Sequence, residues 1–196
     1  MRLSISPKDF DSITKDYMNS ILRAIGKTEE DDKFVVDQLF SGDDPEKSFK
    51  YFDDPYAIVV KRDPRDVYLL SKHVISVYSR WIPTKNVEEF VEYYKILYGN
   101  SKYDSSTRVL EVQYEDLIYQ YEPTVKKVEE FLGISKHTKE KEHFNPAYSE
   151  RYTQLITDYP EEKEAIEYIE KNLSEFLYTF PIKNVVGQSK KGRIIV

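Results

Sequence analysis

Cysteine is absent from this chain of 196 residues. Its absence excludes thiol nucleophiles, disulfides and metal sites built on cysteine ligands, and it fits a reducing compartment, so we expect a cytoplasmic protein. The chain also lacks an apolar run of membrane-spanning length, and its first residues, Met-Arg-Leu-Ser, do not begin a signal peptide. The three histidines lack the spacing of metal ligands, and we therefore predict no metal site.

An excess of positive charge is lacking too. The net charge is −6 and the isoelectric point is near 5.3, which argues against a general nucleic-acid or membrane-surface binder. Hydrophobic residues make up 40% of the chain and charged residues 33%, the balance of a globular protein. Because no repeat or Gly/Ser linker interrupts the sequence, we expect residues 1–196 to form a single domain.

The most informative stretch runs from Tyr56 to Tyr68. It opens with an unbroken apolar run, typical of a strand buried on both faces, and continues through Arg62 and Arg65 into a helix. Ligands bind at the carboxyl ends of strands in open α/β sheets, and helix N-termini present free N–H groups to anions. Since arginine forks suit phosphate, the stretch predicts a phosphate site that includes Arg62 and Arg65.

Apolar runs alternate with helical periodicity along the chain, and this alternation predicts a parallel α/β sheet flanked by helices. We expect three parallel strands, which end near Asp37, Lys61 and Gln113. The expected helices span Pro7 to about Gly26, Val67 to Val77, Asn86 to Leu97, Pro123 to Leu132, Asn145 to Ile156 and Pro160 to Leu177. Three strands make a thin sheet for so many helices.

Two motifs in this order and spacing carry a family resemblance. Y-A-I-V-V-K-R-D-P-R-D-V-Y at residues 56–68 and V-L-E-V-Q-Y-E-D-L at 109–117, followed by a helix and F-L-G-I, resemble the sulfotransferases that use 3′-phosphoadenosine 5′-phosphosulfate (PAPS). The resemblance covers roughly Lys33 to Ile134 and implies a fold like that of the P-loop NTPases. It implies PAPS as co-substrate, with no metal, and transfer of a sulfuryl group to a hydroxyl or amine of a small molecule or carbohydrate.

The resemblance also implies roles for individual residues. Arg62 matches the arginine that binds the 3′-phosphate of the cofactor. The serine that usually follows eight residues later is replaced by Leu70, with Ser71 next to it, so we expect N–H groups at these two positions to assist. Tyr114 matches a tyrosine near the adenine. Relatives place a histidine or an acid just after the preceding strand, and Asp37 is therefore the predicted general base.

One expected element is missing from the sequence. Family members begin with a strand and a glycine-rich loop whose N–H groups and lysine hold the 5′-phosphosulfate. Before Phe34 we find no such loop, and we favour the hypothesis that the chain is truncated at its N-terminus. We therefore expect the 196 residues alone to transfer no sulfuryl group at a useful rate.

Other interpretations stay open at this point. Arg62 and Arg65 could pair with Asp63 and Asp66 around a surface loop, and Tyr114 could simply pack a strand end. A P-loop-type nucleotide kinase would need the glycine loop that is not found. A non-catalytic fragment or nucleotide-binding module is the alternative from another class.

Overall fold

The computed structural model of the chain describes residues 4–25, 34–37, 42–75, 77, 80–99, 103, 106–134 and 144–181. The chain divides into two compact units, one formed by Met1–Val59 and Leu97–Glu111 and the other by Val60–Ile96 and Val112–Val196. No helix in the described ranges is long and apolar enough to cross a bilayer.

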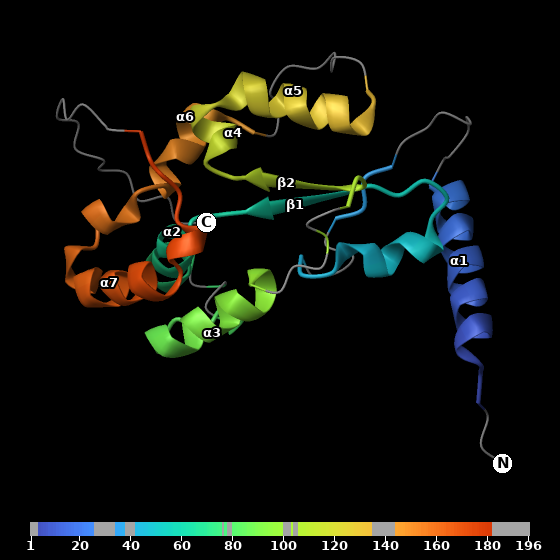
Figure 1. Cartoon of the computed structure of the whole chain (residues 1–196), viewed down its shortest axis with the longest axis horizontal. Coiled ribbons are helices and arrows are strands. Elements are labelled where there is room, and N and C mark those ends of the chain that lie inside the picture. The colour runs from blue at the N-terminus through green and yellow to red at the C-terminus, as the bar shows by residue number, and fades with distance from the viewer. Residues whose placement is uncertain are drawn as a thin grey trace. The chain divides into compact units, whose positions relative to one another are not determined.

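Two strands form the sheet of the described residues. Strand β1 (Ala57–Lys61) pairs with β2 (Val109–Gln113), and both arrows point the same way in Figure 1. The backbone N–H of Ala57 donates to Arg108 O at 2.9 Å, and at the other end Tyr114 N–H donates to Lys61 O at 2.7 Å. The pairing is therefore parallel, and residues 57 and 61 lie beside 109 and 113. The predicted α/β architecture with a parallel sheet is confirmed.

The third predicted strand, at residues 34–36, is wrong. Residues 34–37 form neither strand nor helix, and Val35 is 98% exposed. A strand needs a hydrogen-bonded neighbour and a packed face, and a run of three apolar residues specifies neither.

In the first unit, α1 (Pro7–Ala24) begins where the sequence predicts a helix start. The Ser6 side chain accepts a hydrogen bond from Asp9 N–H at 3.1 Å, which caps the first turn. The helix contacts the 3₁₀ segment η1 (Pro45–Tyr51). Lys50 Nζ lies 2.7 Å from a carboxylate oxygen of Asp11, and the Tyr51 hydroxyl donates to the same oxygen at 3.0 Å.

The second unit holds the larger core. Helix α2 (Pro64–Leu69) follows β1 and widens into the π-helical turn η2 (Leu70–Val74), so the expected helix ends at Val74 rather than Val77. Helix α3 (Val87–Tyr98) starts at Asn86, whose side chain accepts from Glu89 N–H. The most deeply buried apolar side chains of this unit are Tyr68, Leu69, Phe90, Val91, Tyr94, Leu155, Ile169 and Leu173.

After β2 the chain continues through further helices. The short α4 (Asp116–Tyr119) leads into α5 (Tyr121–Leu132), which stops at Gly133 as predicted. The two helices expected after residue 144 are broken into shorter pieces. They are α6 (Pro146–Ser149), η4 (Glu150–Tyr152), η5 (Leu155–Thr157), η6 (Pro160–Glu162), α7 (Lys163–Asn172) and η7 (Ser174–Phe176). Helix α7 and segment η5 both contact α2.

Candidate functional site

The site forms where β1 and β2 end, because parallel pairing brings the residues after both strands to one edge. Arg62 and Asp63 follow β1, and Tyr114 and Glu115 follow β2. The Arg62 guanidinium carbon lies 4.5 Å from the centre of the Tyr114 ring, a cation–π contact. The structure therefore brings together two residues that the sequence predicts in one cofactor site, although they lie 52 positions apart.

Arg62 is held on several sides. Its backbone carbonyl accepts a hydrogen bond from the Tyr94 hydroxyl at 2.5 Å, and its Nη2 donates to the carbonyl of Tyr152. Its Nε is buried and has no hydrogen-bond partner among the described residues. A buried donor without an acceptor is uncommon in proteins, and on an arginine it is a group that can donate a charge-assisted hydrogen bond to an anion.

Ser71 presents a second buried group of this kind. The residue is fully buried, and its Oγ has no hydrogen-bond partner in the part of the chain that the structure describes. The Leu70 N–H, in contrast, bonds to the carbonyls of Asp66 and Val67 inside the helix. In this strand–loop–helix, Ser71 therefore offers a side-chain ligand, whereas the Leu70 N–H is already paired. The serine expected at position 70 is found one residue later, at position 71. The π-helical turn at Leu70–Val74 accommodates one extra residue in this stretch, which matches the displacement.

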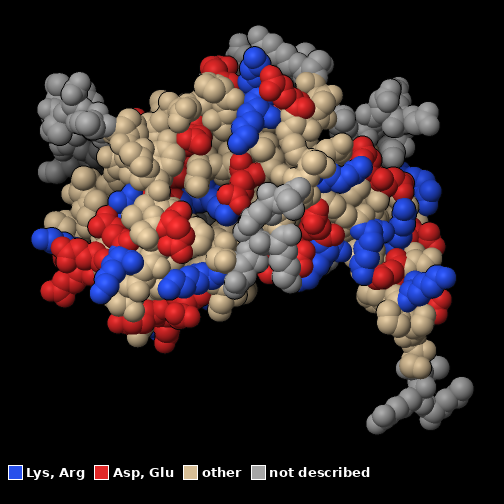
Figure 2. Space-filling view, in the orientation of Figure 1, with Lys and Arg blue, Asp and Glu red and all other residues tan. Residues whose placement is uncertain are grey.

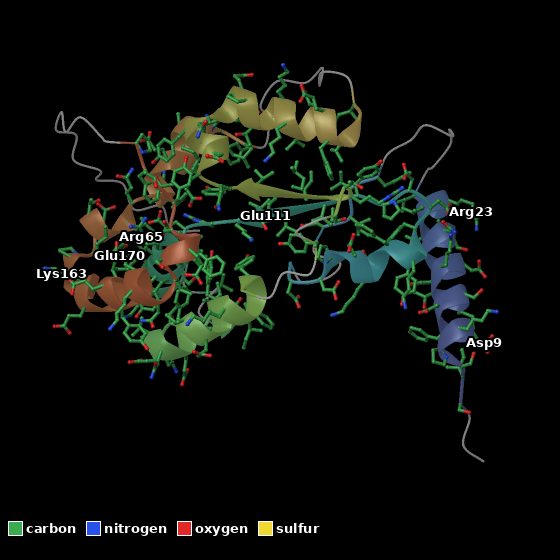
Figure 3. The ribbon with its side chains drawn as sticks, in the orientation of Figure 1. Asp9, Arg23, Arg65, Glu111, Lys163 and Glu170 are labelled. Carbon is green, nitrogen blue, oxygen red and sulfur yellow. The ribbon has the colours of Figure 1, made fainter. Side chains whose placement is uncertain are left out.

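Arg65 has a different environment from Arg62. Its Nε and Nη2 donate to the two carboxylate oxygens of Asp63 at 2.9 and 2.6 Å. Its Nη1 donates to Glu170 at 2.8 Å, and Nη2 also reaches the Tyr178 carbonyl at 3.0 Å. Figure 3 shows Arg65 of α2 beside Glu170 of α7. This geometry gives Arg65 a structural role, and its part in cofactor binding stays a prediction.

Asp63 and Asp66 are buried acids rather than parts of a surface loop. Asp63 caps α2 by accepting from Arg65 N–H at 2.9 Å, and it also accepts from Tyr178 N–H at 2.8 Å. Asp66 accepts from the N–H groups of Gln154 and Leu155, both at 2.9 Å. Burial raises the pKa of Asp66 to about 6, although these N–H bonds oppose the shift.

Asp66 also supports Arg62 indirectly. Gln154 has a φ of 55°, a left-handed conformation that non-glycine residues seldom adopt. The two bonds to Asp66 hold the backbone there, two residues after the Tyr152 carbonyl that accepts from Arg62. Sequence reasoning did not identify this segment, because nothing near residue 152 signals a contact 90 residues away.

Glu115 is the other residue that the sequence did not reveal. It is fully buried, and its Oε1 accepts from Asp63 N–H at 2.9 Å. Burial, together with the charge of Asp63, raises the pKa of Glu115 to about 7. The Asp before a proline at a helix start is a recognisable capping signal for Asp63, whereas the role of Glu115 depends on strand pairing.

The predicted general base, Asp37, lies in the first unit and has an exposed side chain. Its expected position at the end of a strand is not found, since residues 34–37 form no strand. The catalytic role of Asp37 stays a prediction.

Charge of both signs is spread over the molecular surface (Figure 2). Figure 2 shows Asp and Glu side chains interspersed with Lys and Arg over the visible face. Within the described ranges, no group of three or more His, Asp or Glu side chains could hold a metal ion.

Comparison with known proteins gives one result. A profile described as "Sulfotransferase family" matches residues 5–140, more than half of the chain. No curated protein and no solved structure gives a significant match to this chain.

Proposed function

Because this chain belongs to the sulfotransferase family, we propose that it binds PAPS through the edge of the sheet where Arg62 and Tyr114 meet. The observation that carries the proposal is the pair of buried polar atoms without partners, Arg62 Nε and Ser71 Oγ, in one strand–loop–helix. Both can donate to phosphate oxygens, so the residues present fit the 3′-phosphate of the cofactor.

Each residue has a definable task in this site. Arg62 binds the 3′-phosphate, and phosphate oxygens replace the Tyr152 carbonyl as acceptors for its guanidinium. Ser71 adds a neutral donor. The Tyr114 ring stacks against Arg62, which fixes the plane of the fork, and its remaining surface is available to the adenine. PAPS supplies the sulfuryl group.

The acceptor in this proposal is a hydroxyl or amine of a small molecule or carbohydrate, and Asp37 removes its proton. Sulfuryl transfer resembles phosphoryl transfer in that positioning and charge stabilisation supply most of the rate enhancement. The role of Asp37 rests on the family resemblance, which places an acid or histidine at this point of the sequence, and on the carboxylate chemistry of general bases.

The test compares adenosine 3′,5′-diphosphate (PAP) with adenosine 5′-phosphate, which lacks the 3′-phosphate, by calorimetry. We expect wild type to prefer PAP. A charge-assisted arginine contact contributes on the order of 2 kcal/mol, so Arg62→Ala should weaken PAP binding roughly 10- to 50-fold and change binding of the monophosphate less than about twofold. Arg62→Lys keeps the positive charge without the fork-shaped donors, and its affinity for PAP should lie between those of wild type and Arg62→Ala.

Arg108→Ala is the matched control, because Arg108 is exposed at the start of β2 and pairs with Asp54 at 2.7 Å. It should bind both nucleotides as wild type does. If Arg62→Ala weakened the binding of both nucleotides equally, or did not weaken the binding of PAP, Arg62 would not be the ligand of the 3′-phosphate.

A further inference from the structure

Glu115 joins the two loops that carry the proposed ligands. Its Oε1 accepts from the N–H of Asp63 at 2.9 Å, and the residue is fully buried. Arg62 immediately precedes Asp63, and Tyr114 immediately precedes Glu115. Together with the hydrogen bond from Tyr114 N–H to Lys61 O, this contact helps to fix the spacing between the arginine and the aromatic ring beside it.

The second oxygen of this carboxylate is unusual. Glu115 Oε2 is buried, and no described residue forms a hydrogen bond to it. A buried carboxylate oxygen without a donor is costly while it carries charge, and protonation removes that cost. The Oε2 atom is thus a place where a proton can be added without breaking the bond from Oε1 to Asp63 N–H.

The charged and titratable groups around Glu115 come from the loop after β1, from α2 and from the C-terminal segment. Asp63 and Arg62 lie on the loop after β1, and the negative charge of Asp63 raises the pKa of Glu115 whereas Arg62 lowers it. Tyr178, in the C-terminal segment, is neutral at physiological pH because burial and Asp116 raise its pKa to about 12. Asp63 is itself balanced by Arg65 at 2.6 Å. Arg62 is therefore the cation that favours the charged form of Glu115.

We propose that Glu115 is a positioning residue that takes up a proton on Oε2 when phosphate binds to Arg62. This inference rests on the proposed function. A bound phosphate neutralises the guanidinium and adds negative charge nearby, so the charged carboxylate loses its stabilising partner. The proton comes from the buffer, and no other bond is made or broken. The Oε1 contact to Asp63 persists in both states, which keeps the loop in place.

Calorimetry of PAP binding in two buffers of different ionisation enthalpy measures the proton uptake directly. At pH 7.5 we expect wild type to take up roughly 0.3 to 0.7 proton per PAP. Its affinity should fall about 5- to 10-fold from pH 6.5 to 8.5, since the carboxylate becomes charged over this range. The phosphate groups of PAP also titrate, near pH 6, and this contribution to the pH dependence is the same for wild type and all variants.

Glu115→Gln keeps an acceptor for Asp63 N–H and cannot titrate. It should bind PAP with no Glu115-linked proton uptake and with less than about a twofold change in affinity over the same range. Glu130→Gln, at an exposed position of α5, should behave as wild type. If the role of Glu115 were purely structural, Glu115→Gln would bind PAP more weakly than wild type by the same factor at every pH. The pH profile of the affinity therefore distinguishes the two roles.

The outcomes separate the two proposals. If wild type fails to bind PAP, the proposed function is wrong and this inference falls with it. If wild type binds PAP and Glu115→Gln takes up as many protons, the proposed function stands and the role of Glu115 is wrong. If Glu115→Gln does not fold, the wild-type measurement decides alone, because binding without proton uptake between pH 7 and 8 overturns the inference.

Discussion

Arg62 and Arg65 lie three positions apart and share the same chemistry, but the fold gives them different partners. Arg65 has acceptors on Asp63, Glu170 and the Tyr178 carbonyl. Arg62 keeps a buried donor without a partner. The sequence predicts that arginines lie at this strand end, because the apolar run and the proline mark the transition to a helix. It cannot assign their distant partners, since Tyr152 lies 90 positions from Arg62, and Glu170 and Tyr178 lie 105 and 113 positions from Arg65.

Asp37 provides the test of the catalytic prediction. In a preparation that turns over PAPS, Asp37→Asn should lower kcat at least a hundredfold, because an amide cannot accept the acceptor's proton. The affinity for PAP should not change. Asp16→Asn, on the exposed side of α1, is the control. Retained turnover in Asp37→Asn would show that another group acts as the base.

At the scale of elements, local signals predicted the helices well where capping residues are present. Ser6, Asn86 and Gly133 each mark a helix end that the structure confirms. The strand predicted at 34–36 failed because three apolar residues do not specify a pairing partner. The helix predicted at Asn145 to Ile156 is interrupted where Asp66 holds the Gln154 backbone in a left-handed turn, a tertiary contact that periodicity does not reveal.

The end of α5 permits a direct measurement. Gly133 has a φ of 59°, and a Cβ at this position would meet no atom within 4 Å, so the cost of a side chain is backbone strain alone. Gly133→Ala should lower the free energy of unfolding by about 1 kcal/mol in urea titrations. Gly133→Asn should cost less, because asparagine adopts this conformation more readily. Equal stability of all three proteins would contradict a left-handed helix end.

For the whole molecule, the buried acids make stability depend on pH. The folded chain raises the pKa of Asp66 to about 6 and that of Glu115 to about 7, above their unfolded values, so it binds protons more tightly than the unfolded chain. The corresponding stabilisation is complete below about pH 4 and is lost as pH rises through 6 and 7. Each of the two groups accounts for a loss on the order of 3 kcal/mol.

Urea unfolding of wild type, Asp66→Asn and Glu115→Gln between pH 4.5 and 7.5 measures this loss. The amide variants do not titrate, and the free energy of unfolding should therefore fall less steeply with pH in each variant than in wild type. The variants also lose hydrogen-bond acceptors or charge. This loss shifts the free energy of unfolding by a constant at every pH, so the slope of the free energy against pH is the quantity to compare. Parallel curves for the three proteins would mean that neither acid titrates between these limits.

The contacts that complete the site have a consequence for how the chain folds. Asp63 N–H reaches Glu115, Arg62 reaches Tyr152, Asp66 reaches Leu155, and Asp63 accepts from Tyr178 N–H. Their sequence separations are 52, 90, 89 and 115 residues. Loops of this length close slowly, whereas helices form from local contacts. During synthesis, the sheet edge around Arg62 therefore stays incomplete until Tyr178 has left the ribosome, and the proposed anion site is among the last parts of the protein to form.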